Sequence, residues 1–387
     1  MHNFENQTAS QITNGSLPSR VLGRRAFLGR MATGAALLAP GASLLAAGKA
    51  KGRPNLSKGD AALLRFAAAA EILETDFWVQ YNELAGIQDS EEPDGTGNPD
   101  FTNAVKQLDG DMDQYIHDNT EDERTHFTFL NAYLMSKGAQ PVSLEPFRNL
   151  TATSSKATGS SQKPRLTNLT QLTLDTSWWT RYRSRTENPD LDPSFVFPQA
   201  IPDLFTGQHT AIPRTNADVM NADLLQVIAN TAGFHFATIE QGGNSLYPSM
   251  AQRAQSVEVL RILISIGPTE TMHFQTWQDK AGNAPQFSAF DPVNNNTVTF
   301  PDLNSPPFPA GFGLEDFQTN LIMPEPCPFV SPSLPVCSVI RPTETNGIAM
   351  GVVNFLTNMG LFIGQSPAFF AFLNQLAMEA DSAQREG

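Results

Sequence analysis

Two segments of this 387-residue chain carry a glutamate and a histidine three residues apart, at Glu123 and His126 and again at Glu270 and His273. Both segments have the apolar spacing of amphipathic helices. Residues three apart share one face of a helix, so each pair directs a carboxylate and an imidazole toward the same point. The fold of this chain must therefore accommodate two helices whose polar faces cannot simply be buried among apolar side chains.

The hydrophobic periodicity predicts four long helical segments. They run from Gly59 to Ala85, from about Phe101 to Lys137, from about Asn216 to Tyr247 and from Ala251 to Lys280, with Pro248 separating the last two. The first segment is rich in alanine and free of proline. The first and third segments each offer an inward-capable glutamate without a histidine partner, at Glu71 or Glu74 and at Glu240.

The remainder of the chain after the N-terminus divides into three regions. Residues 138–215 interrupt the helical pattern and predict a long crossover inserted into a bundle that spans residues 59–280. Residues 281–342 hold twelve of the 28 prolines and predict an irregular but ordered layer. Residues 343–383 predict two short helices around Gly364 that pack on the bundle.

The N-terminal residues 1–47 resemble a bacterial twin-arginine export signal. Arg24 and Arg25 are followed by Ala-Phe-Leu and by a mildly apolar run that ends in small residues. The run is shorter than the roughly 20 apolar residues that a membrane-spanning helix needs. An ordinary secretion signal is the alternative. Both interpretations predict a periplasmic or extracellular protein without a membrane anchor once the signal is removed.

Composition excludes several classes of function. The chain has 25 Lys and Arg residues against 39 Asp and Glu residues, a net charge of −14, which disfavours nucleic acid as a partner. Its two cysteines, Cys327 and Cys337, are too few for a zinc or iron–sulfur site built on four thiolates. They either form a disulfide that closes a short loop or remain unpaired thiols. Any metal must use carboxylate and imidazole.

The order Glu, Glu-x-x-His, Glu, Glu-x-x-His resembles the ferritin-like family of di-metal carboxylate proteins. The resemblance covers about residues 59–137 and 216–280. It implies an all-α, ferritin-like four-helix bundle with a long crossover insertion, a Pro-rich irregular layer and extra C-terminal helices. It also implies a site for two divalent metal ions, iron or manganese, with the ligands Glu71, Glu123, His126, Glu240, Glu270 and His273.

The choice between Glu71 and Glu74 as the first ligand is not forced. Each is followed seven residues later by an aromatic residue, Trp78 or Tyr81, on the same helical stripe. The local string from Ala70 to Phe77 resembles the opening of secreted ferritin-like and plant desiccation-related proteins, in which the first glutamate is the ligand. This resemblance favours Glu71.

Physical chemistry supports metal ions at such a site, although local alternatives exist. Four carboxylates inside a bundle repel one another and lose hydration unless cations or protons neutralise them. Glu123, however, also ends a capping box that begins at Thr120. Pro268 interrupts the last segment and can place Glu270 in the first turn of a helix. The pair Gly242-Gly243 marks either a helix end or a close contact near the site.

These features lead to two hypotheses about function. The first is an exported stress-protection protein whose di-metal site oxidises Fe²⁺ or acts on O₂ or peroxide, with Tyr247 as a nearby hydrogen-bonding or redox group. The second is a non-catalytic desiccation or stress scaffold without functional metal. The sequence does not identify catalytic residues or decide whether the protein is an enzyme. The expected partners are a metal ion or a small oxidant, and the expected assembly is a monomer or small homo-oligomer.

Overall fold

The computed structural model describes residues 56–182, 196–305, 323–325, 331, 333–335, 337–339 and 347–384. The longer helices are α2 (Lys58–Ala85), α4 (Met112–Ser136), α7 (Ala222–Ala251), α8 (Val257–Gly282), α10 (Ile348–Asn358) and α11 (Pro367–Asp381). Shorter ones are α3 (Pro99–Val105), α5 (Ser177–Arg181) and α6 (Asn216–Met220), with 3₁₀ turns at Glu145–Phe147 and Pro202–Phe205. The predicted all-α class is confirmed.

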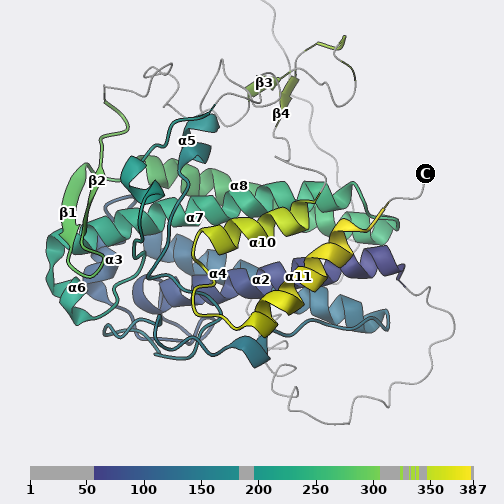
Figure 1. The fold of residues 1–387 in the computed structure, drawn as a ribbon, viewed down its shortest axis with the longest axis horizontal. Helices are drawn as coiled ribbons and strands as arrows, with labels where there is room; N and C mark the ends of the chain where they lie inside the picture. The colour runs from purple at the N-terminus through teal and green to yellow at the C-terminus, as the bar shows by residue number, and fades with distance from the viewer. Residues whose placement is uncertain are drawn as a thin grey trace, which may run out of the picture. The chain divides into compact units, whose positions relative to one another are not determined.

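Four helices form the bundle. Helix α2 packs against α4, α7 packs against α8, and α2 also contacts α7. Figure 1 shows these four helices running alongside one another. Helix α2 is buried around its whole circumference, because α11 packs on a side that the bundle leaves open. Three of its alanines, Ala67, Ala68 and Ala69, have no exposed surface and let neighbouring helices approach closely.

The helix boundaries differ from the prediction in two places. The second predicted segment, from about Phe101 to Lys137, is not continuous but is broken between Val105 and Met112, where α3 ends and α4 begins. Pro248 does not separate the third and fourth segments but lies inside α7. The helix tolerates it three residues before its end, and the turn to α8 follows after Ala251.

The crossover between α4 and α7 is tied to α2 by two buried carboxylates. Asp76 Oδ2 accepts hydrogen bonds from the backbone N–H groups of Leu166 and Thr167, both at 2.9 Å. Glu83 forms a buried ion pair with Arg165. These contacts satisfy carboxylates that would otherwise be costly to bury.

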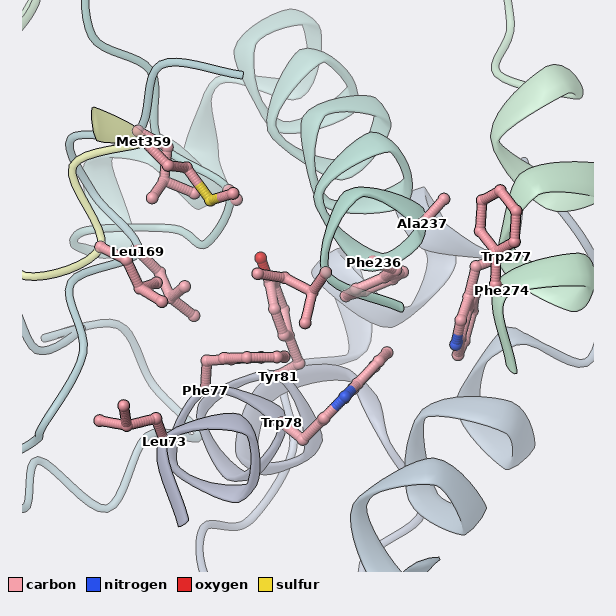
Figure 2. Close-up of a cluster of buried hydrophobic side chains, with 14 of the residues drawn as sticks. Leu73, Phe77, Trp78, Tyr81, Leu169, Phe236, Ala237, Phe274, Trp277 and Met359 are labelled. Atoms are coloured by element: carbon pink, nitrogen blue, oxygen red, sulfur yellow. The ribbon is translucent and has the colours of Figure 1, made fainter. Parts of the chain in front are cut away.

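Aromatic residues from three bundle helices fill the core beside the site. Trp78 of α2 stacks on Phe236 of α7 and on Trp277 of α8, with ring centroids 4.8 and 5.2 Å apart (Figure 2). Tyr81 packs edge-on against Phe236 and donates or accepts a hydrogen bond at His235 Nδ1, 2.8 Å away. Burial lowers the pKa of His235 to about 3, so this histidine is a neutral member of the core.

The regions outside the bundle are partly described. In the Pro-rich region, β1 (Phe287–Asp291) pairs antiparallel with β2 (Asn296–Phe300), and β3 (Met323–Glu325) pairs antiparallel with β4 (Cys337–Val339). Helices α10 and α11 pack on each other, α10 on α7 and α11 on α2. The predicted export signal and Cys327, the expected disulfide partner of Cys337, lie outside the described residues. Among the described residues, no helix combines the length and apolarity needed to span a bilayer.

Candidate metal centre

The two Glu-x-x-His pairs lie on α4 and α8 and face each other across the bundle. Glu123 and Glu270 are both completely buried, at 0% exposure. His273 Nδ1 lies 3.0 Å from Glu123 Oε1, and His126 Nδ1 lies 3.0 Å from Glu123 Oε2 and 3.4 Å from Glu270 Oε1. The histidine of each helix thus reaches a carboxylate of the other helix.

The remaining two predicted ligands come from α2 and α7. Glu71 Oε2 lies 3.3 Å from His126 Nδ1, and Glu240 Oε2 lies 3.4 Å from His273 Nδ1. The potential ligand atoms form two sets, in each of which all atoms lie within 4.8 Å of one another. One set holds Glu71 and His126, the other holds Glu240 and His273, and both contain Glu123 and Glu270. The structure therefore brings all six predicted site residues together, and two glutamates are shared between two potential metal positions.

Local alternatives suggested by the sequence do not apply. Thr120 is an interior residue of α4 whose hydroxyl donates to the carbonyl oxygen of Ile116 at 2.6 Å, so Thr120 and Glu123 do not cap a helix. Helix α8 continues through Pro268, and Glu270 lies in its interior. The Thr269 hydroxyl donates to the carbonyl oxygen of Ile266 at 2.6 Å beside the proline.

The glycine pair in α7 makes room for the site. Both glycines lie inside the helix, so the alternative of a helix end is wrong. A Cβ atom on Gly243 would overlap the carboxylate of Glu270, whereas a Cβ atom on Gly242 would meet nothing within 4 Å. Gly243 therefore allows the carboxylate of α8 to lie directly against the backbone of α7.

Buried polar atoms at the centre lack hydrogen-bond partners. These atoms are Glu240 Oε2, whose nearest histidine nitrogen is His273 Nδ1 at 3.4 Å, and both carboxylate oxygens of Glu270, of which Oε1 lies 3.4 Å from His126 Nδ1. Among the described residues, no lysine or arginine lies within ion-pair distance of Glu71, Glu123, Glu240 or Glu270; their charged neighbours at that distance are His126 and His273. Native proteins rarely leave buried carboxylate oxygens unpaired. The donor set, carboxylate with imidazole, fits iron or manganese.

Electrostatics show the same shortage of positive charge. Burial raises the pKa of Glu71 to about 7, against the opposing effect of His126. Burial and the neighbouring carboxylates raise the pKa of Glu270 well above its usual value. Burial also disfavours the charged form of Glu123, but His126 and His273 outweigh it and hold its pKa below the usual range. Burial opposes protonation of both histidines as well, yet the carboxylates raise their pKa values. Without cations, the site must hold protons.

Three side chains that the sequence analysis did not identify contact the candidate ligands and can orient them. Asp122 Oδ2 lies 3.3 Å from His273 Nε2, and Thr269 Oγ1 lies 3.3 Å from His126 Nε2. Each can accept the ring N–H and so direct the other nitrogen, Nδ1, toward the centre. Asn119 donates to Glu123 Oε1 and Glu240 Oε1, both at 2.9 Å. The sequence gives one indication of a role for Asp122 and Thr269, which is that each directly precedes the glutamate of a Glu-x-x-His motif.

Tyr247 lies beside the candidate metal centre, as the sequence predicts, and forms a hydrogen bond there. Its hydroxyl is buried and donates to Glu71 Oε1. Glu74, the alternative first ligand, is buried nearby but does not belong to either set of potential ligand atoms, and its Oε1 has no hydrogen-bond partner. Trp78, seven residues after Glu71, stacks in the aromatic core. The geometry therefore favours Glu71 over Glu74.

Comparison with known proteins agrees with this architecture. The family model for the ferritin-like domain matches residues 59–168. This part of the chain is similar to the ferritin-like domain. The matched residues include α2 and α4, with Glu71, Glu123 and His126, whereas α7 and α8 lie beyond the match and join the site through the contacts above. No curated protein and no solved structure matches the chain.

A third group of potential ligand atoms lies away from the centre. Asp89, Glu91 and His117 meet near the start of α4, and His117 is buried while Asp89 is largely exposed. Both ring nitrogens of His117 already contact carboxylates, those of Asp89 at 3.2 Å and Asp118 at 3.1 Å. Burial disfavours the charged imidazole, but these carboxylates outweigh it and raise its pKa. This group therefore forms an ion-paired cluster.

Proposed function

We propose that the ferritin-like bundle binds two divalent metal ions, iron or manganese, between α2, α4, α7 and α8. The observation that carries the proposal is the set of buried carboxylate oxygens on Glu240 and Glu270 that accept no hydrogen bond and have only His126 and His273, and no lysine or arginine of the described residues, within ion-pair distance. Glu71 and His126 would hold one ion, Glu240 and His273 the other, and Glu123 and Glu270 would contact both. Two such ions side by side can jointly bind O₂ or peroxide and exchange electrons with them.

The protein's own residues prepare this site in three ways. Tyr247 holds Glu71 through its hydroxyl, and Asp122 and Thr269 orient the two imidazoles. The stacked rings of Trp78 and Trp277 lie in the apolar core next to the centre, with 0% and 1% exposure. Such surroundings restrict water and strengthen the interaction of the carboxylates with cations. We therefore propose that the site oxidises Fe²⁺ or acts on O₂ or peroxide in stress protection.

Metal analysis of matched variants tests the proposal. Purified protein loaded with Mn²⁺ or Fe²⁺ under anaerobic conditions is expected to hold two ions per chain. Glu123→Gln and Glu270→Gln should each lower the content at both positions, whereas Glu71→Gln should affect one. Glu74→Gln is the control, because Glu74 is buried close by but lies outside both ligand sets. Metal content that stays at zero in the wild type, or is unchanged in all variants, would instead favour a non-catalytic stress or desiccation scaffold.

We also propose that the protein is exported and works in the periplasm or outside the cell. The support is the pair Arg24-Arg25 before an apolar run in the sequence. Replacing both arginines with lysine should retain the protein in the cytoplasm, and Arg20→Lys serves as the control. Normal export of the double variant would indicate an ordinary secretion signal.

For the assembly we propose a monomer or a small homo-oligomer. The C-terminal helices α10 and α11 cover α7 and α2, so these bundle faces are already occupied within one chain. Light scattering after size-exclusion chromatography measures the mass directly. A particle of many subunits would contradict the proposal.

A further inference from the structure

A pocket of about 220 Å³ lies between α5, α7 and α10, outside the set of metal ligands. Its wall is mostly apolar and includes Trp178, Ile348, Val352 and Phe355. Asp175 and Arg181 bring charge to the same wall. Pockets that bind small organic molecules combine an apolar wall with few polar groups in this way. We call it the outer pocket.

A second pocket, of about 40 Å³, shares part of its lining with the outer pocket and is called the inner pocket. Its lining includes Glu71, Glu74 and Tyr247, so it reaches a proposed ligand and the hydroxyl that holds this ligand. Gly242, Val352 and Phe355 line both pockets. The two pockets therefore meet along one stretch of α7 and α10.

Gly242 is positioned where the pockets meet, and its lack of a side chain leaves space there. A Cβ atom at this position would have no heavy atom within 4 Å. The neighbouring glycine differs, because a Cβ atom on Gly243 would overlap Glu270. Glycine is less favourable than alanine inside a helix, so two adjacent glycines need a reason. The contact with Glu270 explains Gly243, and the open junction gives a reason for Gly242.

Arg181 provides positive charge at the outer pocket. Its Nε atom is buried without a hydrogen-bond partner, and its guanidinium carbon lies 5.6 Å from the centre of the Phe197 ring. Among the described residues, no carboxylate lies within ion-pair distance of it. Asp175, on the same wall, already accepts hydrogen bonds through Oδ1 from the Ser177 N–H at 2.9 Å and from Gln199 at 3.0 Å. The guanidinium can therefore pair with a negative group on a ligand.

We propose that the outer and inner pockets form one passage to the metal centre, and that this passage binds a small aromatic carboxylic acid. The carboxylate pairs with Arg181, and the ring lies against Trp178 and Phe355 and points past Gly242 toward Tyr247. The volume of the outer pocket is below the range of about 300 to 1,000 Å³ that is typical of pockets for drug-sized ligands. A ligand with a single ring therefore suits its size. The proposal deepens the proposed function, because the passage ends at Glu71.

Binding of 4-bromobenzoate to the full chain tests the passage. Calorimetry on metal-free and Mn²⁺-loaded protein should show one site, and the anomalous signal of bromine in crystals should lie between Arg181 and Gly242. Gly242→Leu places a side chain in the junction and should weaken binding at least tenfold, while the metal content stays at the wild-type value. Gly110→Leu is the control, since Gly110 also has open space around it but lies away from both pockets.

A second variant tests the contribution of the Arg181 charge separately. Arg181→Gln should weaken 4-bromobenzoate about tenfold, as expected for loss of a charged hydrogen bond of about 1.5 kcal/mol. The same variant should leave the affinity for neutral 4-bromobenzyl alcohol unchanged. This comparison remains decisive if Gly242→Leu does not fold.

The outcomes separate this inference from the proposed function. A wild type that binds metal but not 4-bromobenzoate overturns the passage alone. Binding that neither variant changes, or a bromine signal elsewhere, also overturns it. A wild type without metal that binds the acid at the predicted place, and loses it in the variants, supports the passage while the di-metal function fails.

Discussion

Trp277 donates its indole N–H to the amide oxygen of Asn119 at 2.8 Å, and this bond determines which end of the amide faces the proposed metal centre. With the oxygen engaged, the amide nitrogen points at Glu123 and Glu240, to which it donates at 2.9 Å each. An amide in the opposite orientation would direct an oxygen at two carboxylates. A core tryptophan thereby orients two proposed ligands that it does not touch.

Trp277→Phe should lower metal affinity by about 10- to 100-fold, the usual effect of removing a group that orients a ligand. Trp78→Phe is a matched control, because Trp78 stacks on Trp277 but its indole nitrogen has no hydrogen-bond partner. Both variants lose a similar volume from the core and should lose comparable stability. Competition titrations with a Mn²⁺ chelator measure the affinity, and equal losses in the two variants would contradict the role of the hydrogen bond.

Asp122→Asn should also weaken metal binding by about 10- to 100-fold, because the carboxylate at His273 Nε2 fixes the ring and raises its basicity. Asp113→Asn on the same helix serves as control, since Asp113 pairs with Lys106 far along α4 from the motif. The same titration applies. An Asp122 variant that binds metal like the wild type would show that His273 is held by other contacts.

The periodicity and the two motifs were sufficient to predict the helical class and to name six side chains that the structure brings together. They were not sufficient to separate the acidic residues of α2 by role. Glu71 and Glu74 face the same region, and Asp76 and Glu83 are equally buried but bind the crossover instead. That distinction depends on contacts with residues 82 and 90 positions further along the chain, which no local sequence pattern reveals.

Local rules also failed where tertiary contacts override them. The sequence from Thr120 to Glu123 has the form of a capping box, but α4 had already begun at Met112 and both side chains face inward. Pro268 should disturb a helix. Helix α8 nevertheless continues through it. Beside the proline, Gly267 packs directly against Tyr247 of α7, where a Cβ atom would lie 2.8 Å from the Cβ of that tyrosine.

Adjacent glycines of α7 should respond differently to alanine. Gly242→Ala gains helix propensity of about 1 kcal/mol without a clash, so the protein should become slightly more stable and keep its metal. Gly243→Ala would displace the end of the flexible Glu270 side chain, so it should lower metal affinity by at least tenfold with a smaller effect on folding. Thermal unfolding and Mn²⁺ titration of both variants test this. Equal metal affinity in the two variants would contradict the close contact between the Glu270 carboxylate and Gly243.

The metal-free protein should lose stability as the pH rises from about 5 to 7.5. The pKa of Glu71 is raised by burial from 4.5 to about 7, so between these values the folded chain holds a proton that the unfolded chain has released. The histidines act in the same direction, because their carboxylate neighbours, which outweigh burial, raise their pKa values in the folded state, and this stabilisation is lost as the pH rises.

Metal binding should reverse this dependence, since the ions require deprotonated carboxylates and neutral imidazoles. The difference in Tm between Mn²⁺-loaded and metal-free protein should therefore increase from pH 5 to 7.5. For Glu71 alone the free-energy change is on the order of 3 kcal/mol. Glu71→Gln should flatten the pH profile of the metal-free protein, whereas Glu145→Gln, at an exposed position, should not. A Tm difference that is constant with pH would mean that metal binding does not displace protons from the buried carboxylates.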